Sequence, residues 1–259
     1  MHAGASLNAG VEISWLDSKT FEENKKSLSE LKNYDGIIIP GGFGSSGVEG
    51  KISAISYARL NNMPFLGLCY GLQLAVVEYA RNVCGLKDAN TTEVNPKTSS
   101  PVIDVQPAQR EILEKNMYGG TMRLGAYTAV LKDKTQVLKL YQETGRLEED
   151  EKRILELNKD KAQAFRIGIL EKGKKSVLER HRHRYEVNPQ FVDLIEKNGM
   201  IFSGYHTRGD NTRLMEYIEL PGQSWRGTQG HPEFKSRLGN PSPLFYGFVR
   251  DALKYSELK

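Results

Sequence analysis

Short apolar runs alternate with helix-compatible stretches over the early part of the chain. Residues 35–40 and residues 64–68 are apolar runs with the length and composition of buried strands. The first is followed by a glycine-rich stretch and then by a helical pattern over 51–61, and the second by a helical pattern over 72–83. This strand–helix–strand–helix order predicts an α/β fold with a mostly parallel central sheet.

The same kind of pattern returns near the C-terminus. Before the first apolar run, residues 11–15 alternate apolar and polar side chains, and residues 18–33 are polar and helix-compatible. Late in the chain we expect helices over 189–198 and 244–253 and strands over 200–205, 213–219 and 224–228. The late strands extend the predicted sheet, and no internal repeat is visible.

Two stretches in the middle break this pattern. Residues 90–107 are rich in Thr, Ser, Asn and Pro, which is typical of a long ordered loop. Residues 142–176 are highly charged with scattered leucines and isoleucines at helical spacing, which predicts a helical, surface-exposed insertion. We therefore interpret residues 1–259 as one domain with a charged insertion at 142–176.

Composition narrows the class of protein. The net charge of +4 arises from 36 basic and 32 acidic residues spread along the chain, so neither nucleic acid nor an anionic membrane is an expected partner. The two cysteines, Cys69 and Cys84, form no metal-binding or disulfide pattern. No apolar run approaches the ~20 residues of a membrane span, and residues 1–5 lack the basic-then-apolar order of a signal peptide. A soluble protein of the reducing cytoplasm, without a metal, is expected.

The most informative motif lies where the second apolar run meets a helix. Residues 67–71 have the form Gly-x-Cys-x-Gly, the pattern of a nucleophile elbow. Glycine is needed at Gly67 and Gly71 because a side chain there would crowd the tight turn. The positive end of the following helix favours the thiolate, so we expect Cys69 to be a low-pKa nucleophile. The alternative is a buried structural cysteine.

A cysteine nucleophile that attacks an amide needs a base. His231 follows the last predicted strand, and Glu233 lies two residues beyond it. This spacing lets the carboxylate turn back to the imidazole and orient it. The order Cys69, His231, Glu233 therefore predicts a catalytic triad assembled from distant segments, although His-x-Glu alone also occurs in surface turns.

Several longer motifs resemble a known family. Residues 40–44, 67–73 and 231–233 together resemble the class I glutamine amidotransferases, which implies a three-layer α/β fold. Within that class, the glutaminase domain of CTP synthase is the most similar, through residues 119–125, 179–189 and 231–237. The resemblance implies hydrolysis of glutamine to glutamate and ammonia, for use by a synthetase (amidoligase) domain in pyrimidine nucleotide biosynthesis.

The resemblance also implies roles for individual residues. The backbone N–H groups of Gly42 and Tyr70 correspond to the oxyanion hole. The residues that correspond to the glutamine-binding site are Gln73, Glu93, Arg184, Phe43 and Tyr185. An acid for the α-amino group and a guanidinium for the α-carboxylate are the chemically expected partners. No cofactor is implied in this domain, and GTP is implied as an allosteric effector of the full enzyme.

Two other motifs have competing interpretations. The Arg/His alternation over residues 180–184 suits a solvated basic strand, or a strand with its arginines on one face and its histidines on the other. The stretch from Gly44 to Lys51 resembles a phosphate loop, but it has one residue too many, and Ile52 replaces the required Ser or Thr. Nucleotide hydrolysis by this chain is therefore not expected.

The chain also departs from the family. Ser46 and Gly230 replace an arginine and an aromatic residue, which weakens the expectation of GTP activation and predicts a looser turn at His231. The amidoligase part and the usual first strand do not match any segment of the chain. The alternatives are therefore a catalytically impaired regulatory or interaction module, or a cysteine hydrolase of γ-glutamyl peptides.

Overall fold

The predicted apolar runs form neighbouring parallel strands at one end of a central sheet. The computed structural model describes residues 1–105 and 122–259. The seven-stranded sheet has the order β1-β2-β10-β9-β8-β5-β6. Its strands are β1 (Ile37–Ile39), β2 (Phe65–Leu68), β5 (Arg123–Leu131), β6 (Lys175–His183), β8 (Ile201–Thr207), β9 (Arg213–Glu219) and β10 (Trp225–Thr228).

Strand direction in this sheet is largely uniform, but the pairing is mixed. β1 with β2, and β2 with β10, are parallel neighbours. All the other pairs are antiparallel because each includes β9 or β5, the two strands that run against the rest. The expected α/β fold is confirmed. The expected mostly parallel sheet is correct for strand direction, while direct parallel pairing is confined to β1, β2 and β10.

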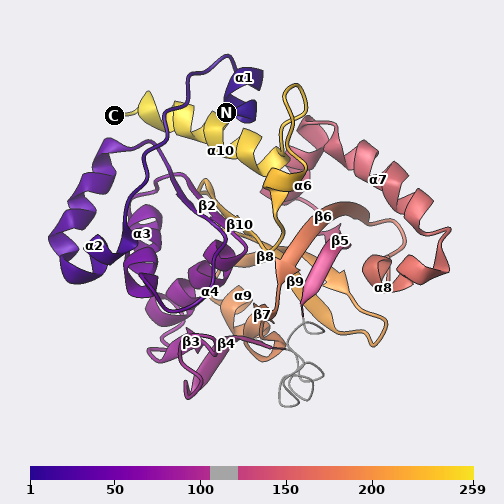
Figure 1. The fold of residues 1–259 in the computed structure, drawn as a ribbon, viewed down its shortest axis with the longest axis horizontal. Helices are drawn as coiled ribbons and strands as arrows, with labels where there is room; N and C mark the ends of the chain where they lie inside the picture. Colours follow the sequence, from indigo (N-terminus) through magenta and orange to yellow (C-terminus); the bar gives the residue numbers. More distant parts are fainter. Residues whose placement is uncertain (106–121) are drawn as a thin grey trace.

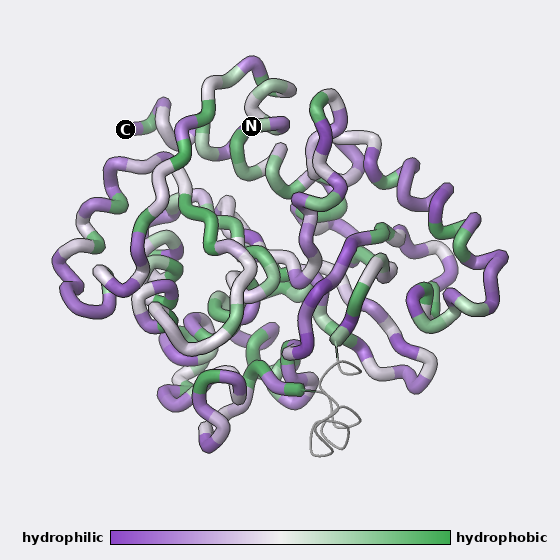
Figure 2. Tube along the Cα trace, viewed as in Figure 1, coloured by the Kyte–Doolittle hydropathy of each residue, from purple (hydrophilic) through white to green (hydrophobic). Residues whose placement is uncertain are grey.

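Side chains of successive residues enter different cores on the two faces of the sheet. In β2, Phe65 belongs to one core, which is covered by α3 (Val48–Leu60), α4 (Tyr70–Asn82) and α9 (Val192–Lys197). Leu66 and Leu68 belong to the other core, which is covered by α6 (Gln136–Glu143), α7 (Arg146–Leu157) and α10 (Pro243–Ser256). Figure 1 shows the sheet between these two layers of helices. Figure 2 shows hydrophobic residues concentrated in the central strands. The structure is therefore a three-layer α/β arrangement.

The predicted helices are present to within a few residues, whereas α1 and α6 were not predicted. The α-helices are α1 (His2–Ser6), α2 (Ser18–Glu23), α3 (Val48–Leu60), α4 (Tyr70–Asn82), α6 (Gln136–Glu143), α7 (Arg146–Leu157), α8 (Ala164–Ile167), α9 (Val192–Lys197) and α10 (Pro243–Ser256). The 3-10 turns are η1 (Lys25–Asn33), η3 (Lys161–Gln163), η4 (Pro189–Phe191) and η5 (Pro232–Phe234). No helix in the described part of the chain is long and apolar enough to span a membrane.

The local sequence pattern was misleading at two places. The predicted loop over 90–107 contains short strands, because β3 (Ala89–Thr91), β4 (Ser100–Val105) and β7 (Tyr185–Val187) form a separate three-stranded sheet. Residues 106 and 107 lie outside the described part. The alternating residues 11–15 form no strand and are mostly exposed, because no neighbouring strand offers them backbone partners. Both errors concern pairing between distant segments, which local patterns do not report.

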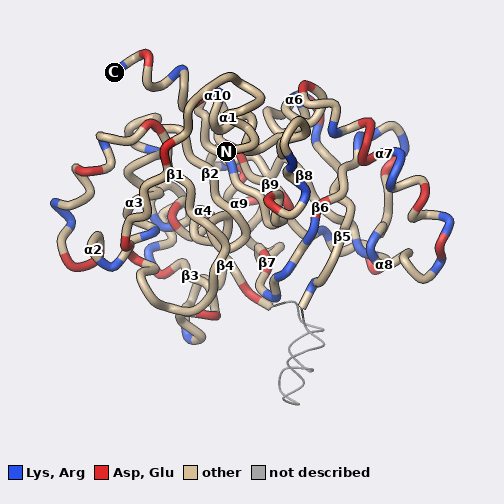
Figure 3. Tube along the Cα trace, turned by 45° about the horizontal axis from the view of Figure 1, so that its top comes forward, with Lys and Arg blue, Asp and Glu red and all other residues tan. Residues whose placement is uncertain are grey.

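The charged stretch 142–176 is helical, as predicted, but it is not merely a surface layer. Figure 3 shows mixed charges along α7 and α8. The inner side of α7 nevertheless carries the fully buried Asp150, whose carboxylate accepts hydrogen bonds from Lys235 Nζ at 2.7 and 2.9 Å and from the Leu178 N–H at 3.0 Å. Because Lys235 follows the His231 turn, this segment supports the chain near the predicted catalytic residues.

We predict that Asp150→Ala destabilises the protein by about 3 kcal/mol or more, since removal of one partner leaves the nearly buried Lys235 ammonium poorly compensated. The adjacent exposed pair of Glu151 with Lys175 supplies a matched control. Glu151→Ala is expected to change stability by less than about 1 kcal/mol. Denaturant unfolding of the two variants measures this difference. Equal stabilities would show that the α7 contact is not a structural anchor.

Candidate active site

The nucleophile elbow has the strained geometry that its sequence predicts. Cys69 follows β2 as the N-cap of α4, with φ 51° and ψ −99°. A Cβ on Gly67 would lie 2.7 Å from the Gly71 carbonyl, and a Cβ on Gly71 would lie 2.1 Å from the Ile39 carbonyl oxygen. Any larger residue at either glycine would displace backbone. The crowding therefore explains both glycines and leaves Cys69 in a rare conformation.

His231 and Glu233 are paired as their spacing predicts. Nδ1 of His231 lies 2.6 Å from Oε1 of Glu233, while Nε2 is buried and has no hydrogen-bond partner among the described residues. A Cβ on Gly41 would lie 2.9 Å from His231 Cε1 and 3.7 Å from Cys69 Cβ. The imidazole and the cysteine thus border the same small space, with one ring nitrogen oriented by a carboxylate and the other unpaired.

The turn that carries His231 is held on both sides. The His231 N–H donates to the Arg180 carbonyl at 2.8 Å, and the Gly230 N–H donates to Thr228 Oγ1 at 3.1 Å. A Cβ on Gly230 would lie 3.0 Å from the Cβ of Glu179. Glycine therefore fits closely packed surroundings at this position, and the structure does not show the loose turn that its presence suggested.

The loop that contains Gly42 is held by hydrogen bonds to two side chains, Tyr70 of the elbow and Glu93 from the segment after β3. The Tyr70 hydroxyl donates to the Gly44 carbonyl at 2.5 Å, and the Gly44 N–H donates to Glu93 Oε1 at 3.0 Å. Burial raises the pKa of Tyr70, and nearby Glu93 raises it further, so the hydroxyl remains a donor. The family resemblance concerned only the Tyr70 backbone, and the contact made by its ring hydroxyl was missed.

The remaining residues expected to bind glutamine are only partly gathered at the site. Gln73 is buried and its Nε2 donates to the Tyr185 carbonyl at 2.8 Å. Burial raises the pKa of Tyr185, Glu93 raises it further and Arg184 lowers it. Phe43, in contrast, is 86% exposed and is not brought into the site.

Gln229 is a site residue that sequence reasoning missed. It follows β10, is fully buried, and its Nε2 lies 3.5 Å from Cys69 Sγ. Its Oε1 accepts from Gln73 Nε2 at 3.2 Å. The sequence signal that could have indicated it was its position two residues before His231, directly after a predicted strand. The structure shows that this strand, β10, is parallel to β2 and paired with it.

Comparison with known proteins gives independent evidence on the family of this chain. The sequence model of the family described as Glutamine amidotransferase class-I matches residues 1–250. The chain belongs to the class-I glutamine amidotransferase family. The solved structure described as the Trypanosoma brucei CTPS glutaminase domain with bound acivicin is 31% identical, with a TM-score of 0.79, over 98% of this chain and 84% of that one.

Curated relatives are longer than this glutamine amidotransferase domain. CTP synthase of Methanopyrus kandleri is 46% identical over 254 residues, which cover 97% of this chain and 41% of the relative. CTP synthase of Pyrococcus furiosus is 44% identical over 259 residues, which cover the whole chain and 41% of the relative. The chain thus spans about two fifths of the length of these relatives. Residues 119–121, part of one motif that suggested this resemblance, lie outside the described part.

The ionisation of the amidotransferase cysteine differs from expectation. Burial raises the pKa of the Cys69 thiol to about 12, although the Tyr70 backbone N–H and the Gln229 side chain both lower it. The negative charges of Glu186 and Glu233 raise it further. The prediction of a low-pKa thiolate was therefore wrong, because desolvation outweighs the helix terminus.

The alternation over residues 180–184 separates two kinds of side chain. Arg180 and Arg182 are exposed, whereas His181 and His183 are buried, which confirms the predicted alternation for these four residues; Arg184 lies beyond the end of β6 and is only partly exposed. Burial lowers the pKa of both histidines well below the usual range, and the nearby Arg123 lowers it further. The two imidazoles are therefore neutral and make directed hydrogen bonds.

Behind the histidines lies a buried group of charges. The Arg123 guanidinium is 3.2 Å from Glu186 and 2.8 Å from Glu216, and all three side chains are buried. Burial raises the pKa of Glu186 to about 8, against the opposing effect of Arg123, and Glu216 adds to the rise. This group joins β5, β7 and β9 directly behind the backbone of Tyr185.

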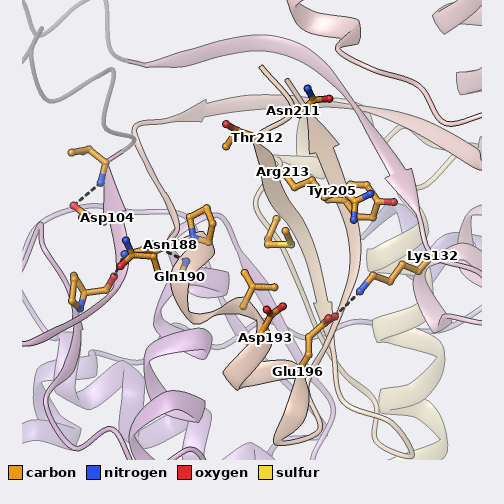
Figure 4. Close-up of a pocket in the computed structure, with 15 residues that line it drawn as sticks. Asp104, Lys132, Asn188, Gln190, Asp193, Glu196, Tyr205, Asn211, Thr212 and Arg213 are labelled. Carbon is orange, nitrogen blue, oxygen red and sulfur yellow. Dashed lines mark hydrogen bonds and ion pairs between the residues drawn. The ribbon is translucent and has the colours of Figure 1, made fainter. Parts of the chain in front are cut away.

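A cavity of about 910 Å³ lies elsewhere, beside α9, η4 and the β8–β9 hairpin. Figure 4 shows the Lys132–Glu196 ion pair at this cavity, with Tyr205 and Arg213 nearby. None of the residues assigned to glutamine chemistry lines it. This cavity is therefore separate from the candidate site around Cys69.

The raised thiol pKa predicts the pH dependence of chemical labelling. Alkylation of Cys69 by iodoacetamide in the absence of glutamine is expected to accelerate about tenfold per pH unit from neutral to mildly alkaline pH, because the thiolate is a minor species throughout. Peptide-resolved mass spectrometry in a Cys84→Ser variant isolates the signal. A rate that levels off near neutral pH would establish a low-pKa thiolate instead.

Proposed function

We propose that this domain hydrolyses the side-chain amide of glutamine to glutamate and ammonia, with Cys69 as the nucleophile. The observation that supports this most directly is the strained elbow, which places Cys69 beside an imidazole whose other nitrogen is 2.6 Å from Glu233. His231 is the general base and acid, and Glu233 orients it and stabilises its charged form.

The reaction proceeds in two balanced halves. The Cys69 proton passes to Nε2 of His231, and the sulfur attacks the amide carbon of glutamine. The carbon–nitrogen bond then breaks, and ammonia leaves with the proton that His231 returns, so that a glutamyl thioester remains. Water attacks this thioester while His231 takes its proton, and glutamate leaves as the proton returns to the sulfur.

The negative charge that develops on the amide oxygen requires donors at the elbow. The backbone N–H groups of Gly42 and Tyr70 are the proposed oxyanion hole. The hydrogen bonds of Gly44 with the side chains of Tyr70 and Glu93 support this role, because they restrain the loop just beyond Gly42. A helix N-terminus at Tyr70 adds a favourable field for an anion.

The two ends of the substrate need opposite charges. Glu93 is proposed to bind the α-amino group and Arg184 the α-carboxylate, with Gln73 and Tyr185 completing the site. Glu93 raises the pKa of Tyr185 and Arg184 lowers it, which supports a site that these three residues share. Because Glu93 also accepts from Gly44, substrate binding and the position of the Gly42 loop are coupled through one carboxylate.

The name of the curated relatives suggests where the ammonia goes. We propose that it is consumed by a synthetase domain of the CTP synthase type, with GTP as an effector of the complete enzyme. The described part contains two free cysteines, Cys69 and Cys84, which suits a reducing cytoplasm. Both the synthetase partner and this location are inferences from similarity and cysteine chemistry.

Removal of the nucleophile is the primary functional test. Cys69→Ala is expected to abolish glutamate release, because no thioester can form. Cys84→Ala is the matched control, and it is expected to retain activity within about threefold, since Cys84 is outside the site. An enzyme-coupled glutamate assay measures both. Wild-type protein without activity, even with a synthetase supplied, would favour the regulatory-module alternative.

Recognition of the α-carboxylate gives a second prediction. Arg184→Ala is expected to raise KM for glutamine by about tenfold to a hundredfold, the effect of losing one charge-assisted hydrogen bond. Arg182→Ala removes an exposed arginine two residues away and is expected to leave KM within about twofold. Steady-state kinetics compares them. An unchanged KM in Arg184→Ala would refute its assignment.

A further inference from the structure

The side chain of Gln229 occupies a position that the catalytic scheme above does not use. It is fully buried, and it lies between the nucleophile and Gln73. Its Nε2 is 3.5 Å from Cys69 Sγ, and its Oε1 is 3.2 Å from Gln73 Nε2. A buried carboxamide in contact with a reacting atom requires an explanation beyond packing.

The direction of this carboxamide follows from its neighbours. A backbone carbonyl can only accept a hydrogen bond, so the Gln73 atom 2.8 Å from the Tyr185 carbonyl must be the amide nitrogen. The same nitrogen lies next to Gln229, and it can only be met there by an oxygen. The NH₂ group of Gln229 therefore faces the sulfur.

The Tyr185 carbonyl is itself held from the opposite side. His183 Nδ1 lies 3.1 Å from this oxygen and must donate to it. The neutral His183 then accepts at Nε2, where His181 Nδ1 is 3.0 Å away and must donate. The orientation of the carboxamide at the sulfur is thus set by a continuous chain of buried hydrogen bonds that begins in β6.

We propose that Gln229 is a further catalytic residue, which stabilises the Cys69 thiolate by donating a side-chain N–H to Sγ, with Gln73 and the Tyr185 carbonyl as the groups that orient it. When the thiol proton passes to His231 Nε2, the sulfur becomes a strong acceptor and the Gln229 N–H is already directed at it. An N–H bond to an anion is stronger than one to a neutral thiol, so the contact favours the ionised form.

This arrangement suits a buried nucleophile in particular. Desolvation disfavours the Cys69 thiolate, and few groups in the site oppose it. A fixed internal donor replaces part of the lost hydration without admitting water that would compete for the thioester. The inference rests on the proposed function for its catalytic meaning, but thiol ionisation is measured independently of glutamine turnover.

The test compares alkylation rates of Cys69 at one mildly alkaline pH. Gln229→Met preserves the approximate volume and removes the donor, so the rate is expected to fall about tenfold to a hundredfold, the effect of one hydrogen bond to an ion. If Gln229 only packed against the elbow, the substitution would loosen the site and labelling would be unchanged or faster. Either of those results would overturn the proposal.

Controls separate the donor from general damage. Cys84 in the same protein is an internal reference whose labelling must not change, and Gln190→Met, at an exposed glutamine in η4, must leave Cys69 labelling unchanged. If Gln229→Met does not fold, Gln229→Asn serves instead, because its shorter side chain withdraws the donor from the sulfur. Labelling of Cys69 at the wild-type rate in Gln229→Asn would overturn the proposal equally.

A double variant tests the orienting role of Gln73. Gln73→Met alone is expected to slow Cys69 alkylation, since Gln229 loses the partner that directs its NH₂ group. Combined with Gln229→Met it is expected to add no further slowing, because both act through the same contact. Independent, multiplying effects would refute the chain. Normal thiol behaviour without any glutamate release would instead refute the proposed function and leave this inference intact.

Discussion

The close approach of backbone at Gly67 and Gly71 is the constraint on which the rest of the site depends. Helix α4 begins so near β1 and the end of β2 that neither position has room for a Cβ. This contact forces Cys69 into a positive φ and places its sulfur at the start of a helix. Every other group of the site is arranged around that fixed point, because the elbow cannot shift without disturbing the central parallel strands.

Burial of the sulfur is the consequence of this tight geometry. The thiol is neutral at rest, since desolvation outweighs the helix terminus and the nearby donors. Ionisation of the Cys69 thiol therefore requires a base that accepts its proton and hydrogen-bond donors that stabilise the resulting thiolate. His231, oriented by Glu233, supplies the first, and the N–H groups around the sulfur supply the second.

The sequence predicted what depends on nearby residues. β1, β2, α3, α4, the elbow and the pairing of His231 with Glu233 all follow from short-range pattern or spacing. It did not predict contacts that bring remote segments together, such as Gln229 with Cys69 or Asp150 with Lys235, because a local pattern carries no information about cross-strand neighbours. The thiol pKa was wrong for the same reason, since burial is a property of the whole fold.

We propose that glutamine hydrolysis passes through a covalent glutamyl thioester on Cys69. Rapid acid quenching of the protein during turnover of glutamine, followed by peptide mass spectrometry, tests this directly. We expect a glutamyl adduct on the peptide that contains Cys69 and none on the peptide that contains Cys84. Release of glutamate with no adduct on Cys69, or an adduct on another residue, would contradict it.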